Sequence, residues 1–177
     1  LDTRSSFDKE YRIVRANDRA ERWVHGMGEL EFDAAGKPIR LFGTIHDITE
    51  RKAAESKIEH LAYHDQLTGL PNRLLARDRF EQAAAHAERS DSKVAMLFLD
   101  LDHFKTINAE LGHVVGDALL LEVSARLRLC VRDTDTVSRQ GGDEFLIVLT
   151  EVHDTDAVTF FSTKMLEQLA LPFGIDG

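Results

Sequence analysis

Two adjacent carboxylates, Asp143 and Glu144, follow directly after the glycine pair at 141–142. Runs rich in apolar and β-branched residues flank this stretch at 135–138 and 145–149. Two such runs joined by Gly-Gly predict a β-hairpin, because glycine accepts the positive φ angles of a tight turn. Neighbouring strand residues point to opposite faces, so we expect one of the two acids to face a ligand.

A third acid ends another apolar run. Segment 94–99 is almost continuously apolar and Asp100 follows it, which predicts a strand buried on both faces. If this strand lies beside the hairpin, Asp100 and Asp143 can meet. When carboxylates converge, a hard divalent cation usually neutralises their negative charges. Mg²⁺ is commonly held by one or two carboxylates plus substrate phosphates. The alternative is that these acids are solvated strand ends.

The composition limits the class of protein. The chain has 177 residues, 43% of them hydrophobic, which suffices for one full domain or two partial ones. The formal net charge of -9 argues against a nucleic-acid surface, which usually needs a basic patch. The single cysteine, Cys130, excludes an internal disulfide and fits a reducing compartment. No apolar run approaches the ~20 residues of a membrane span, and the first residue is Leu1, so we expect a piece of a longer protein.

Residues 1–49 alternate like an antiparallel sheet, with strands predicted at 10–14, 22–32 and 39–46. About three strands without a helix cannot bury a core alone. Residues 50–64 are helical in composition, and their apolar stripe has i, i+4, i+7 spacing: Ala54, Ile58 and Leu61. The stripe fits a dimeric coiled coil or a linker helix packed on its own domain, and two heptads are too few to decide.

The remainder alternates helix and strand, which predicts an α/β class. We expect helices after Asn72, at 103–111, at about 115–131 and around 158–169.

Four ordered blocks of this part resemble GGDEF domains, the diguanylate cyclase family. They are Asp65-Gln66-Leu67-Thr68-Gly69-Leu70-Pro71-Asn72-Arg73, Asp100-Leu101-Asp102-His103-Phe104-Lys105-Thr106-Ile107-Asn108, Gly112-His113-Val114-Val115-Gly116-Asp117 and Gly141-Gly142-Asp143-Glu144-Phe145. The resemblance implies an α+β domain of the polymerase-palm or adenylyl-cyclase type. It covers about the first two-thirds of such a domain, so we expect a C-terminally incomplete one.

The early strands resemble the C-terminal part of a PAS sensor domain, ending in the typical Asp47-Ile48-Thr49. The expected division is therefore part of a PAS domain at 1–49, a signalling helix at 50–64 and a GGDEF domain at 65–177. In PAS–GGDEF proteins this helix carries the signal between the domains.

GGDEF cyclases join two GTP molecules into cyclic di-GMP with loss of two pyrophosphates. The 3′-hydroxyl of one GTP attacks the α-phosphate of the other, and each half-site holds one GTP. The resemblance thus implies a homodimer using Mg²⁺ or Mn²⁺, in the cytoplasm or as the cytoplasmic part of a membrane-associated sensor, with no nucleic-acid or membrane contact in this chain. We expect this piece alone to be inactive, because the family's triphosphate contacts lie further on.

The family's metal and catalytic residues map onto four positions. Asp100 and Asp143 match the metal carboxylates, and the carbonyl of Leu101 completes the set. Glu144 matches a residue that contacts metal or deprotonates the 3′-hydroxyl.

The substrate-binding residues map onto four more. Asn108 and Asp117 match the residues that read guanine, whose N1 and N2 donate and whose O6 accepts. Phe104 and Lys105 lie where the backbone and an ammonium group approach the phosphates. Without the resemblance, these four are a turn Asn, a helix-start Asp, a core Phe and a surface Lys.

Arg132 and Asp135 form an Arg-x-x-Asp at the position of the family's inhibitory product site. Arginine can bind phosphate through two N–H groups and stack on guanine, so we expect product inhibition by cyclic di-GMP. One departure is Ala109, where the family usually has Asp; none of the substrate residues assigned here depends on it.

A second hypothesis is a GTP-binding GGDEF module that regulates an attached cyclic di-GMP phosphodiesterase (EAL) domain. Segments 72–80 and 171–173 resemble GGDEF domains that precede EAL domains. The intact signature acids favour the enzyme, because a binding-only module could lose them.

Overall fold

The structure is a computed structural model that describes residues 6–175. The chain divides into two compact units, Leu1–Glu59 and His60–Gly177. None of the helices described is both long and apolar enough to serve as a membrane span. The assignment of residues 1–49 to a PAS domain stays a prediction.

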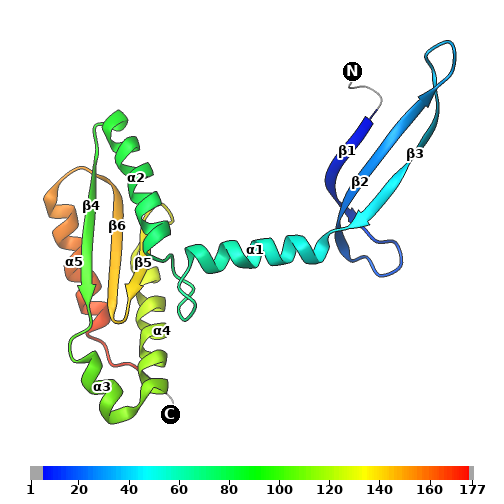
Figure 1. Ribbon diagram of the computed structural model, residues 1–177. Helices are drawn as coiled ribbons and strands as arrows, with labels where there is room; N and C mark the ends of the chain where they lie inside the picture. Colours follow the sequence, from blue (N-terminus) through cyan, green and yellow to red (C-terminus); the bar gives the residue numbers. More distant parts are fainter. Residues whose placement is uncertain (1–5, 176–177) are drawn as a thin grey trace. The chain divides into compact units, whose positions relative to one another are not determined.

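The first unit is a three-stranded antiparallel sheet, as expected from the alternation of its sequence. Its strands are β1 (Ser6–Val14), β2 (Glu21–Phe32) and β3 (Pro38–Asp47), and β2 lies in the middle (Figure 1). Gly28 of β2 is paired with Gly43 of β3. A Cβ atom on Gly43 would lie 2.0 Å from the carbonyl oxygen of Met27, so this pair of strands requires glycine there.

Helix α1 (Thr49–Tyr63) is anchored to this sheet through its first turn. Its Arg51 and Lys52 bind the Glu10 carboxylate of β1 at 2.5 and 2.8 Å. Hydrogen bonds from Lys52 and Arg51 lower the pKa of Glu10 to about 2. No residue of α1 is buried, and the predicted stripe residues Ile58 and Leu61 are exposed.

The second unit is a three-stranded antiparallel sheet with helices on both faces. Its strands, in the order β4-β6-β5, are β4 (Lys93–Asp100), β6 (Glu144–Val152) and β5 (Thr136–Gly141). Helix α2 (Arg73–Ser90) covers one face, and α4 (His113–Cys130) and α5 (Thr155–Leu169) cover the other (Figure 1). The short helix α3 (Phe104–Leu111) follows β4. The predicted helices are therefore confirmed, with ends within a few residues of those expected.

The central strand is β6, and it carries the core. Phe145, Ile147 and Leu149 pack under α4 and α5, whereas Leu146 and Val148 pack under α2. All five side chains are buried, so this run is the one buried on both faces.

Strand β4 was expected to be buried on both faces, and this prediction is wrong. The strand lies at an edge of the sheet and pairs only with β6 among the described strands. Met96 and Phe98 are exposed on the face that α2 covers in part, and Phe98 keeps 76% of its surface. An apolar run alone does not distinguish a central strand from an edge strand, and the tertiary context decides.

The close approach of β2 and β3 generates a stability prediction. Gly43→Ala is expected to destabilise the first unit by about 1–3 kcal/mol, because the new methyl group overlaps a backbone oxygen that cannot move away. In the matched variant Gly28→Ala the methyl group lies 3.2 Å from the Leu41 side chain and 3.3 Å from the Phe42 carbonyl oxygen, and the change should cost less because neither contact is an overlap like that at Gly43. Chemical unfolding followed by circular dichroism measures both; equal stability of the two variants would contradict this account.

Candidate active site

The turn between β5 and β6 consists of Gly142 and Asp143, one residue further along than predicted. Gly141 still pairs with Glu144, which closes a two-residue hairpin. Gly142 has φ +56°, in the left-handed region that favours glycine. Asp143 therefore lies in the turn itself, and Glu144 is the first residue of β6.

The ladder between β4 and β6 places Asp100 directly opposite Glu144. Side chains of opposed residues in an antiparallel pair lie on the same face, so these two carboxylates are neighbours. The next pair, Leu99 and Phe145, points to the α4 and α5 face. Asp143 follows at the turn, next to Glu144 in the chain. The hairpin register thus gathers the three predicted acids at one end of the sheet.

These carboxylates suit a hard divalent cation, because carboxylate oxygens are the ligands it prefers. Among the described residues, no group of three or more His, Cys, Asp or Glu side chains is placed to hold a metal ion. An ion here needs further oxygen ligands, such as substrate phosphates. The carbonyl of Leu101 accepts the N–H of Phe104 at 3.2 Å and retains a second lone pair.

Glu144 also lines a pocket between α2 and the sheet. Its volume is about 640 Å³, and Arg73 and Arg77 of α2 contribute to its wall together with Phe98. Two guanidinium groups therefore lie on the side of the sheet to which Glu144 belongs.

The two predicted guanine-reading residues lie where α3 meets α4. A Cβ atom on Gly116 would lie 2.0 Å from Oδ1 of Asn108, so the Asn108 side chain rests directly on the first turn of α4. Asp117 is the next residue of α4 and is exposed. The amide and the carboxylate are thus positioned by the same helix contact.

Phe104 and Lys105 begin α3 in different environments. The Phe104 ring is buried in the main core, so its side chain supports the fold. Lys105 is exposed and leaves its ammonium group open to solvent.

A contact that the sequence interpretation missed fixes the hairpin turn. Arg139 of β5 donates from Nε and Nη2 to the carbonyl of Gly142 at 3.0 and 2.7 Å. Its Nη1 donates to both carboxylate oxygens of Asp65 at 3.0 and 3.2 Å. The Arg139 side chain is only 11% exposed. Asp65 and Arg139 both lie in or beside motif blocks, but their separation of 74 positions in the sequence hid their pairing.

Asp65 is itself held by its own loop. It accepts hydrogen bonds from the backbone N–H and the hydroxyl of Thr68 at 2.8 and 2.7 Å. Burial raises the pKa of Asp65, but the hydrogen bonds from Thr68 and Arg139 outweigh this effect and lower it overall. The carboxylate is therefore stabilised in its charged form.

The Arg-x-x-Asp segment lies at the other end of the sheet. Asp135 accepts the N–H groups of Thr150 and Arg132 at 2.9 and 3.1 Å, which fixes its carboxylate. Thr150 lies six residues beyond Glu144 on β6, about 20 Å along the strand. The predicted inhibitory residues and the acids at the hairpin therefore lie near opposite ends of β6.

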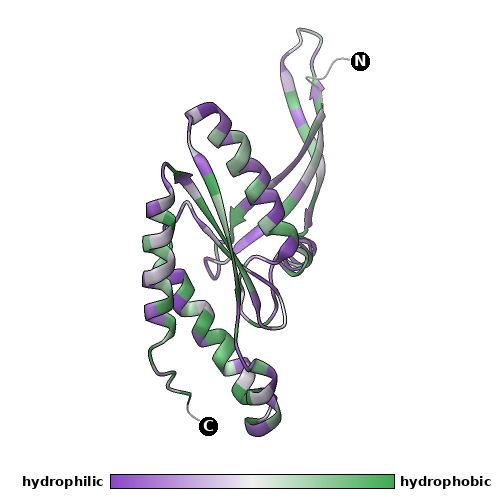
Figure 2. Cartoon of the chain, turned by 90° about the vertical axis from the view of Figure 1, so that its left-hand side faces the viewer, coloured by the Kyte–Doolittle hydropathy of each residue, from purple (hydrophilic) through white to green (hydrophobic). Residues whose placement is uncertain are grey.

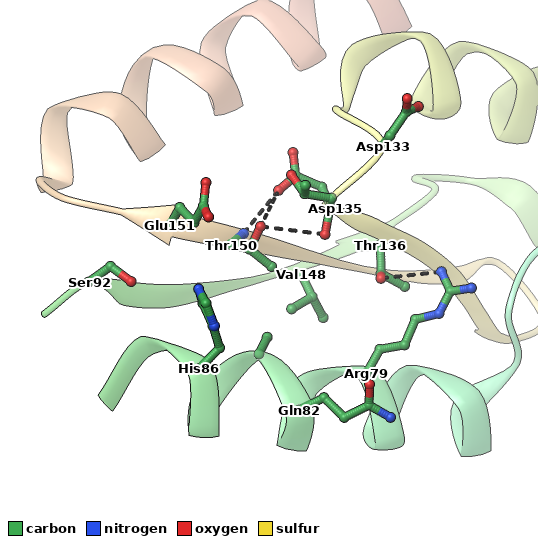
Figure 3. A pocket seen from close by; sticks show the side chains of 12 residues that line it. Arg79, Gln82, His86, Ser92, Asp133, Asp135, Thr136, Val148, Thr150 and Glu151 are labelled. Atoms are coloured by element: carbon green, nitrogen blue, oxygen red, sulfur yellow. Dashed lines mark hydrogen bonds between the residues drawn. The ribbon is translucent and has the colours of Figure 1, made fainter. Parts of the chain in front are cut away.

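Of the hollows that border this segment, one lies on the side of α2 and another on the side of α5. The larger, about 460 Å³, lies between Asp135 and α2, from which Arg79 and His86 point toward the strands (Figure 3). Arg79 donates to the hydroxyl of Thr136 at 3.5 Å. The smaller, about 270 Å³, has Arg132 in its wall and continues to α5.

The Arg139–Asp65 pair generates a pH prediction. Asp65→Asn is expected to destabilise the protein at pH 7 by roughly 1–3 kcal/mol, because a charged acceptor for Arg139 is lost. The folded-state pKa lies below the unfolded value of about 3.9, so the carboxylate contributes fully above that value and loses its contribution as the pH falls through the lowered pKa.

The difference in unfolding free energy between wild type and Asp65→Asn should therefore shrink on acidification, as measured by urea unfolding at a series of pH values. Asp133→Asn, at an exposed position, is the control. A difference that stays constant with pH would count against the ion pair.

Known proteins resemble this chain in sequence and in fold. The family model described as "Diguanylate cyclase, GGDEF domain" matches residues 62–177. The chain is 44% identical over 127 residues to the bifunctional diguanylate cyclase/cyclic di-GMP phosphodiesterase MucR of Pseudomonas aeruginosa, covering 72% of this chain and 18% of that protein. It is 39% identical over 155 residues to the cyclic di-GMP phosphodiesterase PdeR of Escherichia coli, covering 87% and 22%. The chain thus spans about a fifth of the length of these relatives.

A solved structure has the same fold. The sensory box/GGDEF family protein from Caulobacter crescentus superposes with a TM-score of 0.62 at 40% identity, over 65% of this chain and 74% of that one. The match of the family model and the shared fold lead to one conclusion: the chain belongs to the GGDEF domain family of diguanylate cyclases, with its GGDEF domain at residues 62–177.

Proposed function

We propose that the protein to which this chain belongs is a diguanylate cyclase, which condenses two GTP molecules into cyclic di-GMP and two pyrophosphates. The observation that supports this proposal is the hairpin register. It places Glu144 opposite Asp100 and Asp143 beside them. Carboxylates gathered at one end of the sheet suit a divalent cation that takes its remaining ligands from substrate phosphates.

In this proposal Asp100, Asp143 and the Leu101 carbonyl hold Mg²⁺, or Mn²⁺ in its place. The ion supplies neutralisation of the phosphate charge when it is bound. Glu144 accepts the proton of the attacking 3′-hydroxyl. The new bond joins the 3′-oxygen to the α-phosphorus of the second GTP, and the bond to the β-phosphate oxygen breaks as pyrophosphate leaves.

The corner between α3 and α4 binds the rest of the nucleotide. The Asp117 carboxylate accepts from the guanine donors N1–H and N2–H, and the Asn108 amide can donate to O6. Lys105, at the start of α3, carries an exposed ammonium group for the phosphates, and the N–H groups at this helix start add to the positive field.

The productive form in this proposal is a homodimer, because one domain holds one GTP and the reaction needs two. The exposed residues Ile58 and Leu61 of α1 offer a seam for a coiled coil. A PAS-type sensor at residues 1–49 would act on this helix through the contact of Glu10 with Arg51 and Lys52. We place the reaction in the cytoplasm, where GTP is available.

A regulatory role is the second candidate. PdeR, a relative by sequence, is named a phosphodiesterase, and MucR is named bifunctional. A GGDEF module that binds GTP without turning it over and controls an attached phosphodiesterase domain therefore remains the alternative. Turnover by the full-length protein decides between the two.

Turnover is the first test. The full-length protein, incubated with GTP and Mg²⁺, should form cyclic di-GMP detectable by chromatography. Asp143→Ala should lower the rate by about 100-fold or more, because a ligand of the ion and its alignment are lost. Asp78→Ala, on the exposed face of α2, is the matched control. A folded wild-type protein that binds GTP and yields no product would favour the regulatory module, and an active Asp143→Ala variant would remove Asp143 from the site.

Product inhibition is the second test. We propose that cyclic di-GMP binds at Arg132 and Asp135 and inhibits the enzyme. Arg132→Ala should raise the cyclic di-GMP concentration for half-inhibition by about tenfold or more, since charge-assisted hydrogen bonds of roughly 1.5–3 kcal/mol are lost. Arg89→Ala, at the exposed end of α2, serves as control. The same half-inhibition concentration in wild type and Arg132→Ala would place the inhibitory site elsewhere.

A further inference from the structure

Helix α4 has two apolar faces, of which only one is used by the fold. Leu120, Val123 and Leu127 form the buried face. On the opposite face lies a second row, here called the α4 stripe: Val114, Ala118, Leu121, Ala125 and Leu129. Their spacing of i, i+4, i+7, i+11, i+15 keeps them within a sector of about 80° around the helix axis. The hydropathy colouring shows long hydrophobic stretches along this helix (Figure 2).

The ends of the α4 stripe are open to solvent to an unusual degree. Val114 is 84% and Leu129 is 87% exposed, and Leu121 between them is exposed as well. Single exposed apolar residues are ordinary, but a continuous row on one helix face marks an interaction surface. Ala125 is also exposed and Ala118 is partly buried, so the row is open along most of its length.

The spacing of the α4 stripe is self-complementary when two copies run antiparallel. With the twofold axis between positions 121 and 122, Val114 lies opposite Leu129 of the other copy. Ala118 lies opposite Ala125, and these small residues let the helices approach closely. The two Leu121 side chains meet at the axis. Large residues thus face large ones, and small residues face small ones.

Charges beside the α4 stripe favour the same direction. Asp117 and Arg128 lie on the same flank of the stripe, near its two ends, and neither has an ion-pair partner within the part of the chain that the structure describes. Arg128 donates from Nη2 to the Gly69 carbonyl at 3.0 Å, which leaves its other N–H groups available. Antiparallel helices bring Asp117 near Arg128 of the other copy, whereas parallel helices keep these two residues about 16 Å apart along the axis.

We propose that the α4 stripe is a docking surface for a second copy of this chain, with the two α4 helices antiparallel. This contact is separate from any coiled coil formed by α1. A helix of 18 residues is about 27 Å long, so the area covered lies at the low end for specific interfaces. The association is therefore weak and depends on concentration.

Cysteine cross-linking tests the direction of the helices. In a Cys130→Ser background of the full-length protein, Val114→Cys and Leu129→Cys are made singly and together. The double variant should form a covalent dimer on mild oxidation, because the two positions face each other. Each single variant should form much less, since position 114 lies about 22 Å along the axis from its own copy. Efficient cross-linking of a single variant, or none in the double variant, would overturn the proposal.

Sedimentation velocity tests the surface itself. Ile58→Glu with Leu61→Glu first removes any association through α1, and circular dichroism checks the fold of every variant. In that background, adding Leu121→Glu should raise the dissociation constant by at least about tenfold over a protein range of about 1–100 µM. The control Leu166→Glu, at an exposed leucine on α5, should leave the constant unchanged. A background protein that remains monomeric, or equal effects of the two leucine changes, would refute the α4 contact.

Discussion

The guanidinium of Arg139 is the contact on which the geometry of the candidate site depends. Three of its nitrogen atoms donate, two to the Gly142 carbonyl and one to the Asp65 carboxylate. The group is almost completely shielded from water. In such an environment charge-assisted hydrogen bonds are strong and an unpaired charge is costly. Asp143 belongs to the turn whose carbonyl is held in this way. The position of that acid is therefore set by a loop that begins just after α1.

Strand β6 connects the two proposed sites without merging them. Its first residue, Glu144, belongs to the acids at the hairpin, and Thr150 near its end donates to Asp135. Five consecutive buried residues separate them and pack on both faces of the sheet. A strand so tightly enclosed is rigid, so both sites keep fixed positions relative to the core. The proposed substrate and product sites would thus share one scaffold.

Most of the helices and strands and the candidate site residues could be predicted from the sequence, because periodicity and motifs are local. The strands of residues 6–47 and the helices around Asn72, Asn108 and Val123 follow directly from spacing and turn residues. Partners distant in sequence could not be predicted in this way. The exposure of Phe98, the opposition of Asp100 to Glu144 and the pairing of Asp65 with Arg139 depend on strand order and register. These are properties of the assembled sheet, and no single segment contains them.

Helix α1 has its first turn fixed by Glu10 and buries none of its side chains. Side-chain packing therefore does not fix the length of this helix, but the length determines the direction in which its last turn faces. Each inserted residue advances the end of an α-helix by about 1.5 Å and rotates it by about 100°. Insertions of seven or eleven residues restore the direction of the exposed Ile58 and Leu61 face to within about 20°. Insertions of one heptad would therefore nearly preserve the direction of the exposed apolar face of α1. Insertions of other lengths, such as two or five residues, would rotate that face even if every inserted side chain were a conservative choice.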